Sequence, residues 1–223
     1  GLEGFQPGLD GRMLVIADSA LLPLMQPFVV HKNKMGQRTD IVSVSTIGNS
    51  ASQIKSYIEQ EYFTNGLTFV LLVGDDIQVV TNPTPSGDSD PSYGYMLGND
   101  SYAEVIVGRF SANDSAELVT QVRRTIDYEM APVDGATWHK RAICVASDQG
   151  PGDDNEMDFE HARLMRQDLM NYTYDLVDEL YDGSQGLSDS TGDPTSLDMV
   201  AAINDGRGLI TYTGHGSTSG CST

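Results

Sequence analysis

The sequence predicts an α/β protein in which helices flank parallel sheets. Along its 223 residues, short apolar runs rich in β-branched residues alternate with segments of helical spacing. The apolar runs are continuous, which is typical of strands in a parallel sheet that is covered on both faces. The alternation breaks after residue 130 and restarts near residue 140, so we expect two consecutive α/β subdomains, residues 1–134 and 135–223.

The first subdomain is expected to begin with two strands and a helix. A β-branched run predicts a strand at residues 12–17, and Asp18 and Ser19 after it are a plausible cap for the mixed segment that follows. A second strand is expected at residues 40–44. Residues 50–62 carry apolar side chains at helical spacing, which predicts a helix.

A long connection separates the next two predicted strands, residues 67–73 and 104–110. It runs over residues 74–100 and is rich in Pro, Ser, Gly and Asp. Connections of this length are uncommon inside a compact domain, so we expect it to be functional or organised by a metal ion. Asp114, with a glutamate three residues later, then forms a capping pattern for a helix over residues 116–130.

The second subdomain repeats the alternation of strands and helices. Ligands of a parallel α/β sheet bind beyond the carboxyl ends of its strands. The loop that starts at Ser147 and the segment Gly214-His215-Gly216 follow two such ends, so we expect them to share one crevice. The strands are predicted at residues 141–146, 174–180 and 208–213, and the helices at residues 156–172 and 195–204.

His215 stands between two glycines at the end of the last predicted strand, and we interpret it as a general base. A histidine in this position is exposed and free of bulky neighbours. The alternative is a strand-end histidine that is satisfied by local hydrogen bonds. The only candidate nucleophile after it is Cys221, six residues later in a tail rich in Gly, Ser and Thr. Cys144 lies within an apolar run and is expected in the core.

The charge of the chain restricts its partners. The 13 Lys+Arg residues against 32 Asp+Glu give a net charge of −19, which opposes binding to nucleic acid or anionic lipid and favours basic peptide groups or metal ions. No apolar run approaches the roughly 18 residues that span a bilayer. The chain begins with Gly1 rather than methionine, which suggests processing or trimming, and its two cysteines indicate no disulfide framework.

Four stretches of the chain resemble the gingipain family of cysteine endopeptidases, which have a caspase-like fold. The likeness extends in order and spacing from about residue 12 to residue 217 and is closest to the arginine-specific branch. It implies a secreted or cell-surface enzyme with caspase-like parallel sheets flanked by helices, the second subdomain being incomplete here. The stretches are Val70-Leu71-Leu72-Val73-Gly74-Asp75, Leu97 to Glu104 with Val107-Gly108-Arg109-Phe110, Cys144-Val145-Ala146-Ser147, and Leu209 to Ser217.

The resemblance implies a catalytic role for His215. In this family a cysteine thiolate attacks the scissile carbonyl, and the histidine carries the thiol proton to the leaving amine. The backbone N–H of Gly216 would be one oxyanion donor. The family orients its histidine with a carboxylate, a role that Asp148 can fill in this chain. Gln149 stands where the family has Glu and is the alternative through a neutral hydrogen bond, in which case Asp148 is a solvated loop residue.

The nucleophile is expected outside this chain. In the family it follows the histidine at the end of the next strand, and Cys221 lies where the family has no nucleophile. We therefore expect the chain to be the histidine-bearing portion of a protease and to be inactive alone. The cysteine would lie on a second chain or on a downstream segment that is absent here.

Asp158 resembles the carboxylate at the base of the family's primary specificity pocket. Such a carboxylate binds the guanidinium of arginine through two parallel charge-assisted bonds, which lysine cannot reproduce. The resemblance thus implies protein or peptide substrates with basic residues, cleaved after arginine. The alternative is that Asp158 belongs to an acidic helix start, residues 153–158, which the helix dipole favours, and both interpretations can hold.

The resemblance further implies a structural calcium ion that fixes the long connection. Calcium is usually held by alternating side-chain and main-chain oxygens. The implied ligands are the carboxylates of Asp75, Asp100 and Glu104 and the carbonyls of Leu97 and Tyr102.

Two other function classes stay open. A calcium-stabilised surface or binding module would keep the fold without the chemistry. A flavodoxin-like nucleotide or phosphate binder is the weaker candidate, because no glycine-rich phosphate loop follows any strand and the negative charge is unfavourable. A cysteine at a strand end downstream of His215 would favour the protease.

Overall fold

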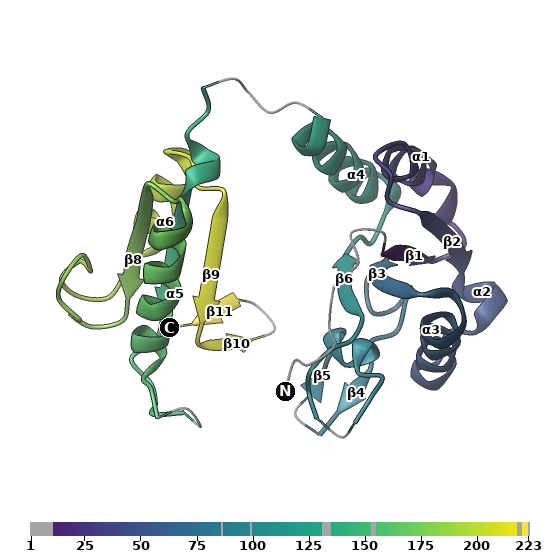
Figure 1. The fold of residues 1–223 in the computed structure, drawn as a ribbon, viewed down its shortest axis with the longest axis horizontal. Coiled ribbons are helices and arrows are strands. Elements are labelled where there is room, and N and C mark those ends of the chain that lie inside the picture. Colours follow the sequence, from purple (N-terminus) through teal and green to yellow (C-terminus); the bar gives the residue numbers. More distant parts are fainter. Residues whose placement is uncertain are drawn as a thin grey trace. The chain divides into compact units, whose positions relative to one another are not determined.

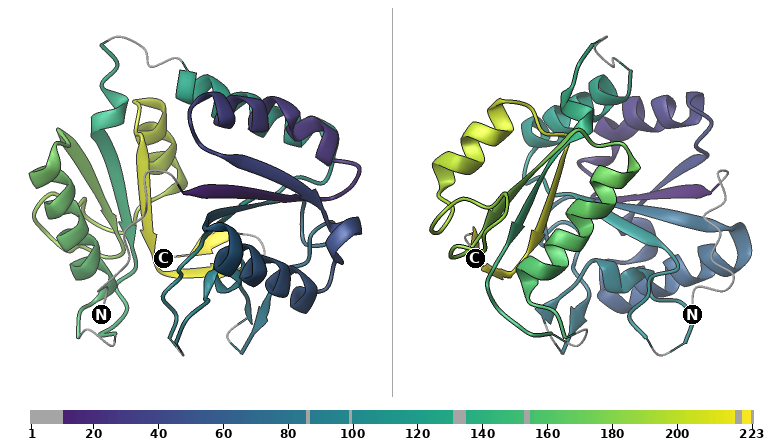
Figure 2. Two further views of the ribbon diagram at one scale, coloured as in Figure 1. Left: turned by 45° about the vertical axis from the view of Figure 1, so that its right-hand side comes forward. Right: turned by 60° about the vertical axis from the view of Figure 1, so that its left-hand side comes forward.

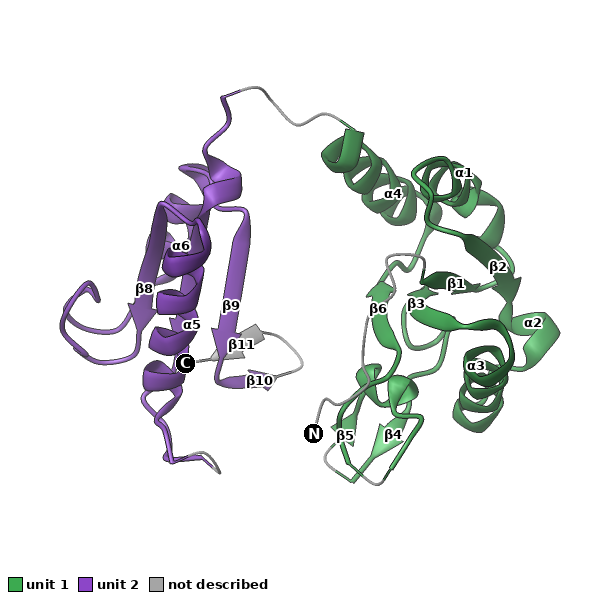
Figure 3. Ribbon diagram, viewed as in Figure 1, with its two compact units in different colours: residues 1–131 green, residues 132–223 purple. Residues whose placement is uncertain are grey.

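The expected fold class is confirmed in a computed structural model of the chain, in which helices flank parallel sheets (Figure 1). The structure describes residues 11–85, 87–98, 100–130, 135–152, 155–217 and 220–222, with residues 217 and 220–222 described by their backbone alone. The chain forms two compact units, residues 1–131 and 132–223 (Figure 3). The subdomain boundary expected at residue 134 lies outside the described residues.

Unit 1 contains a four-stranded parallel sheet in the order β2-β1-β3-β6. The chain adds β2 on one side of β1 and then β3 and β6 on the other, which is the pattern of a doubly wound sheet. The strands are β1 (Arg12–Ala17), β2 (Thr39–Ser43), β3 (Leu67–Val73) and β6 (Ile106–Phe110). The helical segments are η1 (Leu22–Met25), α1 (Gln26–Lys34), α2 (Val44–Ile47), α3 (Ala51–Asn65) and α4 (Ser115–Met130).

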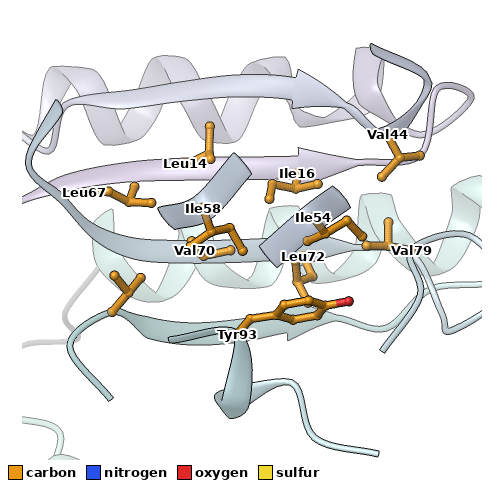
Figure 4. Packing of buried hydrophobic residues seen from close by; sticks show 11 residues of the cluster. Leu14, Ile16, Val44, Ile54, Ile58, Leu67, Val70, Leu72, Val79 and Tyr93 are labelled. Atoms are coloured by element: carbon orange, nitrogen blue, oxygen red, sulfur yellow. The ribbon is translucent and has the colours of Figure 1, made fainter. Parts of the chain in front are cut away.

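Helices cover both faces of this sheet because successive side chains of a strand point to opposite faces. Ile16 of β1 packs with Ile54 of α3 on one face (Figure 4). Its neighbour Val15 belongs to the cluster on the other face, with Phe28 of α1 and Leu118 of α4. Figure 2 shows α1 and α4, in purple and teal, on one side of the sheet and α3, in blue, on the other. The continuous apolar runs of the sequence are thus explained by burial on two sides.

Two strand boundaries differ from the sequence expectation for local reasons. The second strand ends at Ser43 rather than at residue 44, because the Ser43 hydroxyl accepts a hydrogen bond from the N–H of Ser45 and caps α2. The fourth begins at residue 106 rather than 104. The N–H groups of Glu104 and Val105 both donate to the carbonyl of Gly94, which ties these residues to the preceding connection.

One arginine organises the long connection between β3 and β6. Arg109 of β6 donates from Nε and Nη2 to the two carboxylate oxygens of Asp90, at 2.6 and 2.7 Å. Its Nη1 donates to the carbonyls of Gly74 and Val79, both at 2.8 Å. The connection itself contains the short pair β4 (Pro83–Thr84) and β5 (Gly87–Asp88) and the 3-10 turn η2 (Pro91–Gly94). A single guanidinium therefore joins the start of the connection to its middle.

Unit 2 contains a three-stranded parallel sheet in the order β8-β7-β9, followed by an antiparallel hairpin. Cys144 and Ala146 of β7 pack with Ala162 of α5, whereas the alternate residues Ile143 and Val145 pack against α6. The strands are β7 (Arg141–Ala146), β8 (Leu176–Tyr181), β9 (Leu209–Thr213), β10 (His215–Ser217) and β11 (Gly220–Ser222). The helical segments are η3 (Trp138–Lys140), α5 (Asp158–Tyr172) and α6 (Ser196–Asn204).

The core position expected for Cys144 is confirmed. The residue is fully buried, and burial raises the pKa of its thiol. A thiol of this kind stays protonated and out of reach of a substrate, so Cys144 is a packing residue. None of the described helices is long and apolar enough to cross a membrane.

Candidate active site

The candidate site lies in unit 2, at the carboxyl ends of β7 and β9. The N–H of Ser147 donates to the carbonyl of Thr213 at 3.0 Å, so the loop after β7 begins beside the last residue of β9. His215 follows β9 after a single glycine, at the start of β10. Parallel strands end at the same edge of a sheet. That edge therefore brings the two candidate segments of the sequence together.

His215 is held at both its ring and its backbone. Its Nε2 lies 2.8 Å from Oε1 of Gln149, and its carbonyl accepts a hydrogen bond from the Tyr212 hydroxyl at 2.5 Å. An imidazole that carries its proton on Nε2 donates to this amide oxygen and keeps a lone pair on Nδ1. The residue is otherwise exposed. In that tautomer, Nδ1 is the ring nitrogen that can exchange a proton with a reactant.

Of the two residues that the sequence offers for orienting the imidazole, Asp148 and Gln149, the one that contacts the ring in the structure is Gln149. Asp148 is exposed, whereas Gln149 is anchored on both sides of its backbone. Its N–H donates to the Ser147 hydroxyl at 3.3 Å, and its carbonyl accepts from the N–H of Asp158 at 2.9 Å. These bonds turn the chain at the strand end so that the side chain of Gln149, rather than that of Asp148, contacts the imidazole of His215. The orienting group is therefore neutral.

Gly216 lies in the short hairpin that follows β9. β10 and β11 pair Ser217 with Gly220, Gly216 with Cys221 and His215 with Ser222. Among the described residues, and apart from its chain neighbours, no atom lies within 4 Å of where a Cβ on Gly216 would stand, so this side of the residue is open.

Cys221 has its backbone in register with Gly216 rather than with His215. Its side chain lies outside the described residues. The hairpin register therefore gives no support to a direct pairing of this cysteine with the imidazole.

Asp158 is the first residue of α5 and lies against the end of β7. Its Oδ2 accepts a hydrogen bond from the hydroxyl of Ser147, a residue only 1% exposed. The helix begins here rather than at residue 156, because a carboxylate oxygen of Glu160 accepts from the N–H of Met157 and closes the first turn. Asp158 is thus both an acidic helix start, which the dipole stabilises, and a half-buried carboxylate beside Ser147. The remaining acidic residues of this start, Asp153 and Asp154, lie outside the described residues.

Ser147 is the residue of this site that the sequence analysis missed. It was expected only as the beginning of a loop, yet its hydroxyl contacts both Gln149 and Asp158. The available signal was its position directly after five apolar residues of a buried strand, where a serine side chain that stays inside must find polar partners.

The residues implied as calcium ligands belong to unit 1, at the end of β3 and on the connection before β6. Oδ1 of Asp75 accepts a hydrogen bond from the Ser111 hydroxyl at 3.1 Å. Oε2 of Glu104 accepts from the N–H groups of Met96 at 2.7 Å and Leu97 at 3.2 Å. The Glu104 carboxylate therefore already folds this part of the connection onto itself.

The chemistry of the implied ligand set suits calcium. Three carboxylates and two carbonyls are oxygen donors of the kind that a hard cation prefers. Asp100 and Tyr102 are exposed, and Oδ1 of Asp100 accepts from the N–H of Tyr102 at 3.1 Å. Within the part of the chain that the structure describes, no three His, Cys, Asp or Glu side chains are gathered as metal ligands.

Comparison with known proteins gives one consistent family. Residues 6–223 match the model of peptidase family C25. Gingipain R2 and gingipain R1 of Porphyromonas gingivalis are each 36% identical to this chain over 220 residues, which is 96% of it. The chain spans only 29% of the length of gingipain R2 and 21% of that of gingipain R1.

Two solved structures share the fold. The crystal structure of the Arg-specific cysteine proteinase gingipain R has a TM-score of 0.81 and 35% identity, and the match covers 95% of this chain and 48% of that one. The complex of the Porphyromonas gingivalis RgpB pro- and mature domains has a TM-score of 0.79 and 36% identity, with 93% and 48% covered.

Proposed function

Because the chain belongs to peptidase family C25, we propose that it carries the general acid/base and the specificity carboxylate of a cysteine endopeptidase that cleaves after arginine. The contact of His215 with Gln149, beside Asp158 at one sheet edge, is the observation that carries the proposal. The nucleophilic cysteine is assigned to a downstream segment or a second chain. Support for this assignment is that Cys144 is buried and that Cys221 is out of register with His215.

The proposed reaction starts with proton transfer from the thiol to Nδ1 of His215. The thiolate attacks the scissile carbonyl carbon, and the resulting oxyanion accepts a hydrogen bond from the N–H of Gly216. The imidazolium then gives its proton to the leaving amine, the C–N bond breaks, and an acyl-enzyme remains. Water, deprotonated by His215, hydrolyses the thioester and restores the thiol. Gln149 keeps Nε2 protonated throughout, so Nδ1 alone exchanges protons.

Asp158 is assigned to substrate selection. A half-buried carboxylate at a helix start can bind an arginine side chain through two charge-assisted bonds. The net charge of −19 supports basic peptide substrates, and the proposed location is outside the cell or at its surface.

The test is selective cleavage and labelling by the complete protein. We expect hydrolysis of a peptide with arginine before the scissile bond, weaker hydrolysis of the matched lysine peptide, and irreversible labelling by an arginyl chloromethyl ketone. The modified cysteine, found by mass spectrometry, should be neither Cys144 nor Cys221. Absence of both cleavage and labelling would instead favour a non-catalytic binding module with the same fold.

Calcium binding is the second part of the proposal, with Asp75, Leu97, Asp100, Tyr102 and Glu104 as ligands. It is supported by the donor chemistry of these residues. When bound, the ion would supply fixed positive charge and cross-link the connection to the end of β3.

Removal of calcium with EGTA is expected to lower the melting temperature of the protein, and return of calcium is expected to restore it. A ligand present at about 100 times its Kd stabilises the folded state by about 2.7 kcal/mol. The measurement is calorimetry with and without the chelator. Asp100→Asn should abolish the response, whereas Asp76→Asn, next to a proposed ligand, should keep it. A melting temperature indifferent to chelator and calcium in the unmodified protein would remove the site from the proposal.

A further inference from the structure

Ser147 links Asp158, the proposed specificity carboxylate, to Gln149, the residue that contacts the imidazole of His215. The three residues form a closed ring of hydrogen bonds. Its hydroxyl donates to Oδ2 of Asp158 and accepts from the N–H of Gln149 at 3.3 Å. The ring closes through the N–H of Asp158, which donates to the carbonyl of Gln149 at 2.9 Å. The start of α5 and the end of β7 are therefore locked together at both side chain and backbone.

The hydroxyl of Ser147 has a defined effect on the carboxylate. An aspartate side chain turns freely about two torsions unless a partner fixes it, and Ser147 is 1% exposed, so water does not compete for this bond. A carboxylate has about four lone-pair positions. The serine occupies one of them on Oδ2 and leaves acceptor positions on both oxygens.

The orientation of the carboxylate matters more for arginine than for lysine. A guanidinium presents a rigid fork, so both of its bonds form only when the plane of the carboxylate is aligned with it. An ammonium group is a compact charge with rotatable donors and tolerates many orientations. A residue that fixes the plane therefore favours arginine over lysine.

We propose that Ser147 is a positioning residue for arginine selectivity, acting by holding the plane of the Asp158 carboxylate. This inference rests on the proposed role of Asp158 in substrate binding. The preference for arginine is thereby assigned to Ser147 and Asp158 together, and only Asp158 would contact the substrate.

The test compares Ser147→Ala with Asp158→Asn and the double variant in the complete protease. In Ser147→Ala, kcat/KM for an arginyl peptide is expected to fall by about 10- to 100-fold, mainly through KM, as for loss of one hydrogen bond to a charged group. The value for the matched lysyl peptide should change by less than about 3-fold. In the Asp158→Asn background, Ser147→Ala should cause little further loss, because the two residues act through one contact.

Two further variants separate positioning from folding. Ser147→Cys keeps the size of the side chain but donates only weakly, and it should reproduce the loss of arginine selectivity. Ser184→Ala removes an exposed serine of the same unit that accepts from Gly192, and it should leave selectivity unchanged. Melting curves and alkylation of the catalytic thiol by iodoacetamide report whether each variant keeps its fold and its base.

The outcomes distinguish this inference from the proposed function. Equal losses of kcat/KM on arginyl and lysyl peptides in Ser147→Ala, or a loss that adds fully to that of Asp158→Asn, would overturn the role of Ser147. The proposed protease function would be unaffected by that result. If the unmodified protein shows no preference for arginine, the proposed function itself fails, and the role of Ser147 fails with it.

Discussion

Replacement of His215 by alanine is expected to lower kcat/KM of the complete protease for an arginyl peptide by about 10⁴-fold or more. The variant loses the only proposed carrier of protons between thiol and leaving amine. The side chain is exposed, so its removal should leave the fold intact. Because the variant keeps the proposed substrate contacts of Gly216 and Asp158, the loss should appear in kcat and leave KM within a few-fold. Initial rates over a range of substrate concentrations separate the two constants.

His161 offers a matched control for this experiment. It lies on α5 of the same unit, with its side chain 48% exposed and its Nδ1 3.2 Å from a carboxylate oxygen of Glu156. His161→Ala should leave kcat/KM within about 3-fold, as is usual for a surface position. Added imidazole should restore part of the rate of His215→Ala, because the vacated position opens to solvent. Similar losses in the two variants, or a His215→Ala enzyme that keeps a tenth of its activity, would show that another group transfers the proton.

The strands and helices were predictable because local chemistry decides them. The β3 run from residue 67 to 73 is apolar at every position except Thr68 because both faces of the sheet are covered, and sequence alone carries that signal. Asp114 starts α4 as expected, since its Oδ1 accepts from the N–H groups of Ala116 and Glu117. Each of these features depends on residues that are close in the chain.

The details of the candidate site depend on contacts between distant residues, and these were harder to predict. The motif around His215 was placed from the sequence, but its partner is 66 positions away. Asp148 and Gln149 are neighbours, and either could contact the imidazole as far as the sequence shows. The hydrogen bond from the N–H of Gln149 to the Ser147 hydroxyl turns the chain so that Gln149 makes this contact. A sequence pattern lists the polar residues at a strand end. It does not say which of them the backbone turns toward the ring.

In the long connection of unit 1, too, the contacts between residues distant in the chain could not be predicted from the sequence. Its composition predicted an organised loop, and a metal ion was the expected organiser. The organiser that the structure shows is the guanidinium of Arg109, whose acceptors lie 19 to 35 positions earlier in the chain. Strand periodicity predicts only that Arg109 is part of β6, because its partners come from a segment without regular pattern.

Replacement of Arg109 by alanine is expected to destabilise unit 1 by about 3 kcal/mol or more. The side chains of Arg109 and Asp90 are only 11% and 20% exposed, so the variant leaves a nearly buried carboxylate without its counter-charge. It also leaves the carbonyls of Gly74 and Val79 without their donor. Arg109→Lys should recover less than half of the loss, because an ammonium group cannot serve a carboxylate and two carbonyls in a fixed fork.

Arg38 provides the control for loss of an arginine from the same unit. Its side chain is 71% exposed and lies 3.8 Å from Asp40, so Arg38→Ala should change stability by less than about 0.5 kcal/mol. Urea unfolding followed by circular dichroism measures the stability of each variant. Hydrogen exchange should show lost protection in the connection of Arg109→Ala and unchanged protection in β7 and β8. The only tryptophan, Trp138, lies in unit 2 and reports that unit separately.

The pattern of exchange decides what Arg109 does. Loss of protection confined to residues 74–98 would mean that the guanidinium holds the connection while the sheet stands without it. Loss that extends into β3 would mean that the connection is part of the cooperative core of unit 1, since Val79 and Tyr93 are fully buried against that sheet. Unchanged exchange and stability in Arg109→Ala would show that the burial of these two residues is sufficient, and that the four hydrogen bonds of Arg109 contribute no net free energy.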